Sequence, residues 1–503
     1  MREFKTCTLA MALLAASCVN AQQLGSIVFP TSGATAAQPK FIEGVKDLHS
    51  FEFDEAAAAF HEAQRLDPDF ALAYWGEALS YNHPLWAQLD LPASRMALER
   101  LAPTLQGRLA KAQTEKEKAY LEAADRLFYS PGDKLARDNA YCQAMARMYD
   151  RWPEDHEIAI FYALSLLGTL RPQDKGFRRQ ALAASIALKV FQENPSHPGA
   201  AHFIIHAFDD PDHAILALPA ARMYARIAPA APHALHMPSH IFVQLGMWDD
   251  VRASNIVAYK ASVDLIQRMH LPEGREDYHT LSWLEYANLM LGKFDEAHHN
   301  VKLARQAAER NPRNANIANQ YHDALARYIL ETGKWEKIPL EDSPEVPAGH
   351  ETMPGMSMPY TGDATWIFIA GLSAAKLGDP EHAERARAKL SAMRQGTGGA
   401  GDAYAAKPIA VMEDEVAAAV HLARGEKPEA IRLAKEAADI EATLGAPSGP
   451  PDPIKPALEF YGEILLAAGK PAEAAAAFEQ QLLRTPKRTP SVEGLARAVP
   501  VHQ

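Results

Sequence analysis

One helical pattern recurs along the chain and constrains its fold more than any other feature. In its clearest copy, Ala56, Phe60 and Ala63 fall on one helical face at i, i+4 and i+7. Pro68 then ends the helix, and Gly44 lies on the helix before it. Small residues at these places let two helices approach closely, and the aromatic side chain fills the gap between them. The pattern therefore predicts helices that pack in pairs.

The same spacing of small, bulky and turn residues returns down the chain. Its further copies contain Gly246, Trp248, Val251 and Ala258; Gly292, Phe294, Ala297 and Ala304; Gly333 and Trp335; Gly378 and Ala383; Gly425 and Ala430; and Gly462, Gly469, Ala474, Phe478 and Pro486. This pattern resembles the tetratricopeptide repeat (TPR), a helix pair of about 34 residues. The resemblance covers most of residues 37–490. It implies an all-α solenoid of roughly eight to ten TPR-like helix pairs in a right-handed superhelix.

Interruptions of the repeat suggest how the chain is organised. Proline and glycine break the pattern at 82–86, at 270–277 and, at greatest length, at 339–363, and glycines make 391–407 look flexible. We expect a linker over 22–36, a first TPR-like array over 37–338 and a Pro/Gly/Met-rich loop over 339–363. A second array over 364–490 and a tail over 491–503 complete the prediction.

The first 21 residues have the features of a secretory signal peptide. Arg2 and Lys5 precede an apolar run that is too short to span a bilayer, and small residues lead to a cleavage site after Ala21. Lipoprotein processing at Cys18 is the alternative. We therefore expect an exported TPR protein of the bacterial type, periplasmic or secreted, without a membrane span. Cys142 is then the one mature cysteine, and no internal disulfide can form.

The net negative charge argues against nucleic acid as a partner. The net charge is -12, and binding to nucleic acid needs clustered Lys and Arg that release counterions from phosphates. The sequence also lacks the glycine-rich phosphate loops and the Gly-x-Ser-x-Gly and His-Glu-x-x-His motifs of common enzyme classes. Any chemistry must come from other residues.

Histidines carry the chemical signal in this sequence. Among the twenty histidines, His202 and His206 form one His-x-x-x-His pair, and His236 and His240 form another. Residues four apart share a helical face, so each pair can chelate a metal ion. The second pair follows the first by 34 residues, which is one repeat. Imidazoles from two adjacent first helices can then meet at one ion, with metal–nitrogen distances of about 2.0–2.1 Å.

Other histidines follow the same register. His49 and His83 are also 34 residues apart, and His279 occupies an early position of a later repeat. In TPR proteins such positions face the concave groove, so the resemblance implies a groove lined by histidines. His233, Asp209 and Asp210 are candidates for outer ligands or for acceptors that orient the ligating rings. The predicted metal residues are His202, His206, His236, His240, His279, His49 and His83.

The histidine set does not distinguish among several transition metals. Imidazole sets suit zinc, copper, iron or nickel. The segment with His350, Met353, Met356 and Met358 resembles Met-rich copper-handling segments, although three methionines can equally form an apolar flap.

Two functions follow as hypotheses. The first is a protein whose groove binds a transition metal and supports metal-dependent hydrolysis or redox chemistry on a small molecule. Glu77 and Asp210 are the candidate bases for hydrolysis. The second is a TPR scaffold that binds a peptide or partner protein, with no metal and no catalysis.

Overall fold

The structure, a computed structural model, describes residues 23–171, 174, 176–270, 274–340, 362–397 and 404–499. Nearly all regular structure in these residues is helical. The N-terminal half contains α1 (Gln38–His49), α2 (Phe53–Leu66), α3 (Ala71–Ser80), α4 (Leu91–Leu101), α5 (Leu105–Lys111), α6 (Glu115–Tyr129), α7 (Lys134–Arg151), α8 (His156–Gly168), α9 (Arg178–Glu193), α10 (Pro198–Ala207), α11 (Ala214–Ile227), α12 (Pro232–His236) and α13 (Pro238–Gln244). A short antiparallel hairpin lies between α3 and α4 and consists of β1 (Asn82–His83), the 3-10 turn η1 (Pro84–Trp86) and β2 (Gln88–Leu89).

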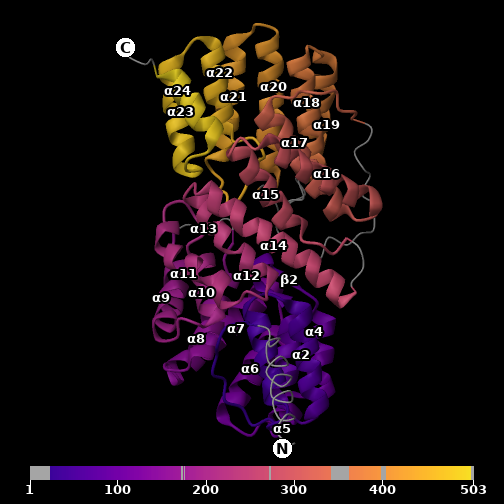
Figure 1. Cartoon of the computed structure of the whole chain (residues 1–503), viewed down its shortest axis with the longest axis vertical. Helices are drawn as coiled ribbons and strands as arrows, with labels where there is room; N and C mark the ends of the chain where they lie inside the picture. Colours follow the sequence, from indigo (N-terminus) through magenta and orange to yellow (C-terminus); the bar gives the residue numbers. More distant parts are fainter. Residues whose placement is uncertain are drawn as a thin grey trace, which may run out of the picture.

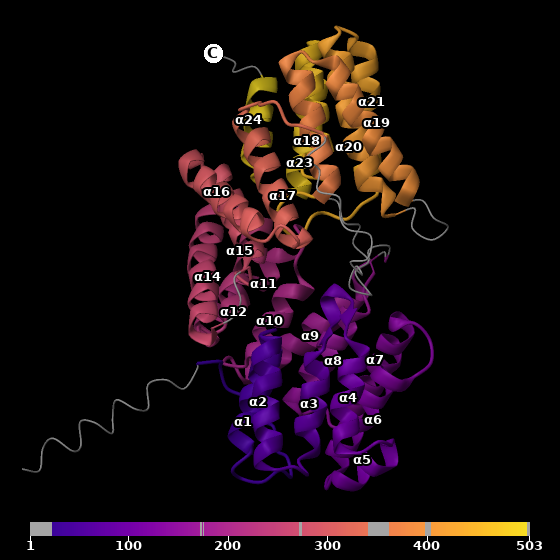
Figure 2. The same cartoon turned by 90° about the vertical axis from the view of Figure 1, so that its right-hand side faces the viewer.

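The C-terminal half continues the series. It contains α14 (Trp248–Met269), α15 (Tyr278–Met290), α16 (Phe294–Arg310), α17 (Ala315–Thr332), α18 (Gly362–Leu377), α19 (Pro380–Thr397), α20 (Ala406–Ala423), α21 (Lys427–Glu441), α22 (Ala457–Ala468), α23 (Pro471–Arg484) and α24 (Thr489–Ala498). Each helix packs mainly against its neighbours in the chain, so the helices form a stack from one end of the molecule to the other (Figures 1 and 2). The predicted all-α fold is confirmed: the described chain is an α-solenoid of TPR-like helix pairs.

Glycines allow the close packing that the repeat pattern predicts. The fully buried ring of Phe60 in α2 lies between Gly44 of α1 and Gly76 of α3. A Cβ atom added to Gly44 would lie 2.9 Å from the ring, and one added to Gly76 would lie closer still. The same arrangement recurs at the other end of the stack with Gly462, Phe478 and Gly494. An aromatic ring between two glycines therefore joins three successive helices.

We expect the substitution Gly76→Ala to destabilise the protein by about 1–3 kcal/mol, because the new methyl group overlaps the Phe60 ring. Adding Phe60→Leu should recover part of this loss, since the smaller side chain frees space. Urea unfolding followed by circular dichroism measures both effects. Gly396 in α19 is the control: no atom lies within 4 Å of a Cβ placed there, so its alanine variant should be no less stable than the wild type. Equal stability of Gly76→Ala and wild type would contradict this packing.

The N-terminal segment differs from the predicted linker. Residues 23–36 lie against the solenoid, with the side chains of Leu24 and Phe29 buried. The Ser26 amide donates to the Ser196 carbonyl oxygen at 2.9 Å, and the Ser32 amide donates to Glu117 Oε1 at 2.6 Å. Two apolar side chains and paired backbone amides hold this segment in place, which its irregular sequence pattern did not indicate.

The repeat predicted around Gly333 is incomplete. Gly333 ends α17 in the left-handed conformation, at φ +65°, as a turn glycine should. The following residues up to 340 form neither helix nor strand, and Ile338 and Leu340 are buried. Pro339 lacks the amide hydrogen that a helix needs, and its carbonyl oxygen accepts a hydrogen bond from Trp366 Nε1 at 3.0 Å. Helix α17 therefore lacks a second helix of its own within the described residues.

The two arrays are not separated in the described part of the chain. Helix α17 packs directly against α18, and the residues around both share one apolar core. Residues 341–361, with His350 and the three methionines, lie outside the described residues, as do residues 1–22. The stretch 391–407, predicted to be flexible, is helical up to Thr397, and residues 398–403 are not described.

The C-terminal segment, expected as a cap or a loose end, forms a helix that caps the stack. Helix α24 continues to Ala498 and packs against α23. The segment before it reaches back to the middle of the chain, where Trp248 Nε1 donates to the Lys487 carbonyl oxygen at 3.0 Å and Thr489 Oγ1 donates to that of Met290 at 2.7 Å. Within the described residues, no helix is long and apolar enough to cross a membrane.

Candidate metal centre

Six histidine side chains converge in the middle of the solenoid, where α10, α12 and α15 lie near one another (Figure 1). The helices that carry them begin at defined signals: α10, α12 and α13 each start with a proline, whose fixed φ suits the first helical position. The six residues are His202 and His206 of α10, His233 and His236 of α12, His240 of α13 and His279 of α15.

The six imidazoles form two groups of three. Triad A is defined as His202, His206 and His233, and triad B as His236, His240 and His279. Within each triad, one nitrogen from every ring lies within 4.8 Å of the others. Each His-x-x-x-His pair therefore has a third histidine from another helix beside it, which makes two three-nitrogen sites.

In triad A the Nε2 atoms face one another. His206 Nε2 lies 3.0 Å and His233 Nε2 lies 3.2 Å from His202 Nε2. His202 Nδ1 lies 2.6 Å from the His49 carbonyl oxygen, which can only accept, so Nδ1 carries the hydrogen and Nε2 carries the lone pair. The three nitrogens lie within 4.8 Å of one another, which is close enough for one metal ion to bind them together.

In triad B the tautomers are fixed on two rings. His236 Nδ1 donates to Asn255 Oδ1 at 2.7 Å, and Asn255 presents its oxygen there because its Nδ2 donates to the Val251 carbonyl at 2.7 Å. His240 Nδ1 donates to Asp209 Oδ2 at 2.6 Å. The two Nε2 atoms therefore face each other, 3.2 Å apart. Two ligands of a tetrahedral zinc-type ion lie about 3.3 Å apart, which is close to this separation.

The charge state of the rings suits metal binding. Burial lowers the pKa of His202 to about 3. Burial first, and then the neighbouring imidazoles, lower the pKa of His206, His233 and His236 well below the ordinary value. These rings are neutral at pH 7, and a neutral imidazole is the form that binds a metal.

The two triads are neighbours. Helix α12 supplies His233 to triad A and, three residues later, His236 to triad B, and the centroids of these two rings are 6.3 Å apart. The rings of His206 and His240 are 6.0 Å apart. Two ions bound in the triads would therefore lie side by side.

This grouping differs from the sequence-based expectation of one shared ion. The two His-x-x-x-His pairs belong to different triads, because consecutive repeats set them side by side and a third histidine completes each set. His279 lies in triad B, as a predicted site residue. His233, expected only as an outer group, points its Nε2 into triad A. The sequence signal for this role was its position three residues before His236, which places both histidines on the short helix α12.

His49 and His83 lie outside both triads. The His83 ring stacks on Phe53 with centroids 3.9 Å apart, and its Nδ1 lies 3.3 Å from Gln88 Oε1. It belongs to the β1–β2 hairpin, because Pro84 ends the helical register that the prediction assumed. The His49 ring is buried in a separate cluster, and only its carbonyl oxygen touches triad A.

The cluster around His49 holds that carbonyl in place. His49 Nε2 lies 2.8 Å from Glu157 Oε2, and His197 Nε2 lies 3.1 Å from Glu157 Oε1. Burial tends to raise the pKa of Glu157, but the two imidazoles outweigh it and hold that pKa at about 2. His197 also caps α10, since its Nδ1 accepts from the Ala200 amide. The carboxylate thus ties the end of α1 to the start of α10, the helix of triad A; neither Glu157 nor His197 was anticipated from the sequence.

Asp209 and Asp210, two candidate acceptors, have different partners. Asp209 orients His240, whereas Asp210 accepts from His213 Nδ1 at 2.8 Å. We expect Asp209→Ala to weaken metal binding at triad B by about 10- to 100-fold, because His240 loses the partner that fixes its tautomer. Asp210→Ala is the matched control and should leave metal affinity unchanged. Competition with a chromogenic chelator measures both affinities. Equal affinities of the two variants would show that Asp209 does not act on the site.

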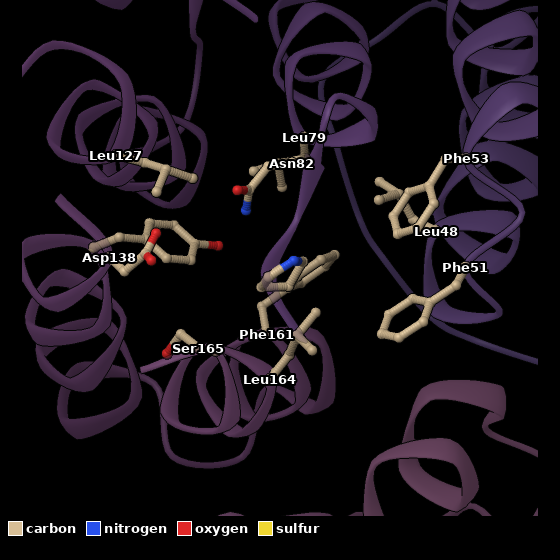
Figure 3. Close-up of a pocket in the computed structure, with 13 residues that line it drawn as sticks. Leu48, Phe51, Phe53, Leu79, Asn82, Leu127, Asp138, Phe161, Leu164 and Ser165 are labelled. Carbon is tan, nitrogen blue, oxygen red and sulfur yellow. The ribbon is translucent and has the colours of Figure 1, made fainter. Parts of the chain in front are cut away.

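An apolar pocket adjoins triad A. Phe51 separates the two, and its ring centroid is 4.4 Å from that of His202. Figure 3 shows Phe51 and Phe53 on one side of the pocket and Asp138 on the opposite side. Asn82 Oδ1 is buried in the wall and has no partner among the described residues. The backbone φ of Phe51 is +58°, an unusual value for a residue with a large side chain.

Two buried residues of α3 have structural roles. Glu77, a candidate base, accepts hydrogen bonds from Gln64 and Arg100. Trp75 is fully buried between Phe29 and Tyr120. Both stabilise helix packing at the N-terminal end.

Comparisons with known proteins give structural neighbours only. No family model and no curated protein matches the chain. The TPR domain of P58(IPK) is 13% identical, with 92% of this chain and 97% of that chain covered and a TM-score of 0.24. Yeast Tom70 is 12% identical, with 92% and 88% covered and a TM-score of 0.33. A Rap protein complexed with competence and sporulation factor is 13% identical, with 87% and 99% covered and a TM-score of 0.32.

Proposed function

We propose that this solenoid binds two transition-metal ions, one in triad A and one in triad B. The observation that carries the proposal is the pair His236 and His240, whose Nδ1 atoms both donate to acceptors while their Nε2 atoms face each other at 3.2 Å. A cation beside both Nε2 atoms can form a coordinate bond with each. Triad A repeats the geometry with His202 at its centre.

The ligand chemistry limits the metal to a small group. Neutral imidazoles suit zinc, copper, iron and nickel, and they disfavour magnesium and calcium, which prefer oxygen ligands. Three protein ligands leave a coordination position free on each ion, as in catalytic rather than structural zinc sites. The proposed centre can therefore support hydrolysis by a metal-bound water or redox chemistry on a small molecule.

Metal analysis of the tag-free protein tests the proposal. After incubation with one metal at a time and removal of unbound ions, elemental analysis should give about two equivalents of zinc or copper per chain. His299→Ala, a substitution of an exposed histidine on α16, should bind the same amount. A wild-type protein that remains fully helical and retains no metal would overturn the proposal.

A second candidate function is recognition of a peptide or partner protein, with no metal and no catalysis. The repeat architecture favours it, since stacked helix pairs present an extended surface to a ligand. The two functions differ in their response to a chelator. Partner binding by the metal-free solenoid should be unaffected, whereas activity that depends on the triads should be lost.

A further inference from the structure

The two triads are built from neutral ligands alone. Every donor atom that converges in them is an imidazole nitrogen, and no carboxylate or cysteine completes either set in the described part of the chain. Two divalent ions would therefore bring four positive charges that no ligating side chain offsets. Burying uncompensated charge is costly, so the centre needs an anion from outside the protein.

Nearby carboxylates are committed elsewhere. Asp209 accepts from His240 Nδ1, on the side of the ring away from Nε2. Glu52 Oε1 accepts from the His233 backbone amide at 3.0 Å. Asp277 accepts from the Thr280 amide at 2.9 Å as the cap of α15. These carboxylates therefore orient the backbone and rings of the triads through hydrogen bonds that lie away from the Nε2 atoms.

The two triads have a buried base and a more exposed edge. His202 and His236 are 0% and 1% exposed, and they form the buried base of the two triads. His206, His233 and His240 are half-buried, and His279 is exposed. A small molecule can therefore reach the free coordination positions without any movement of the base.

From these features we propose that the two ions form one centre that binds a small bridging anion, of the size of hydroxide or azide, between triad A and triad B. The inference rests on the proposed function. Short helix α12 fixes the relation of the two sites, because His233 and His236 are three residues apart on it. The bridging anion supplies the negative charge that the ligands lack and occupies the open position of both ions at once.

Copper(II) and azide provide the test. Two separate copper(II) ions give two unpaired spins per chain in electron paramagnetic resonance, whereas a shared bridging anion couples the two spins and reduces the signal. With two copper(II) ions bound, we expect less than half of the full signal at saturating azide. The variants His202→Ala/His206→Ala and His236→Ala/His240→Ala should each keep one copper with its full signal and bind azide at least tenfold more weakly.

The outcomes separate this inference from the proposed function. Two bound copper ions with the full signal of two spins, and azide affinity equal to that of the variants, would overturn the bridged centre and leave two independent sites. A helical protein that binds neither copper nor any other of the transition metals tested would overturn the proposed function itself. His279→Ala gives a milder test should the double variants unfold: it removes one exposed ligand of triad B and should raise the signal per bound copper.

Discussion

Replacing His202 and His206 by alanine is expected to remove one of two bound metal ions and leave the other. Triad A loses two of its three nitrogens, and a single remaining imidazole, His233, cannot hold an ion at micromolar concentration. Triad B keeps its three rings and the acceptors Asn255 and Asp209. Metal content should therefore fall from about two equivalents to about one.

The reciprocal variant serves as the matched control for this prediction. His236→Ala/His240→Ala should lose the ion of triad B and retain that of triad A, and combining all four substitutions should leave no bound metal. Elemental analysis, with circular dichroism as the check on folding, distinguishes these states. If either double variant lost both ions while remaining folded, the six histidines would form one indivisible site instead of two.

The second large effect concerns Arg488, which lies just before α24. Its side chain is buried and donates to Glu459 from two nitrogens, at 2.8 and 3.0 Å, to Glu331 and to the Tyr286 hydroxyl. Replacing Arg488 by methionine keeps the volume but leaves two buried carboxylates without their main partner. We expect a loss of about 3–5 kcal/mol in the free energy of unfolding.

The same substitution should change the pH dependence of stability. Burial tends to raise the pKa of Glu459, but Arg488 and Lys455 outweigh it and lower that pKa to about 2. A pKa below the unfolded value, about 4.3, stabilises the folded state above that pH, and this stabilisation is lost as the pH falls toward 2. The wild type should therefore lose stability across this window, and Arg488→Met should show a flatter dependence.

Urea unfolding at pH 3, 5 and 7, with hydrogen exchange of α22 and α24, measures both effects. Arg432→Met is the control, because the Arg432 side chain on α21 is exposed and its ion pairs with Glu429 and Glu436 lie at the surface. It should unfold like the wild type. A similar result for Arg488→Met would show that the buried network does not hold the C-terminal cap.

The spacing of small and aromatic residues was enough to predict the fold. Phe60 and Phe478 with their glycines report directly on helix pairing, since only a glycine leaves room for the ring. What the sequence did not indicate depends on long-range contacts. The N-terminal segment is ordered by partners such as Ser196 that lie far along the chain. The described residues 334–340 form no helix after Gly333, and the Pro339 carbonyl oxygen accepts a hydrogen bond from Trp366 of α18.

The candidate site was predictable only in part. The 34-residue register placed four histidines on two adjacent helices, because it counts positions within one repeat. It could not assign the four histidines to two triads, because the third histidine of each triad does not follow the 34-residue register. His233 lies near the start of α12, and His279 lies on α15. The roles of Glu157 and Asn255 depend on hydrogen bonds between helices, which carry no periodic signal.

The way α12 divides its two histidines between the triads has a mechanical consequence. A helical-repeat array bends and twists through small rotations at the junctions between successive repeats. The ligands of triads A and B come from the first helices of three consecutive repeats, namely α10, α12–α13 and α15. Two ions bound there would link these repeat units near the middle of the solenoid. The curvature of the solenoid would then depend on whether the ions are bound.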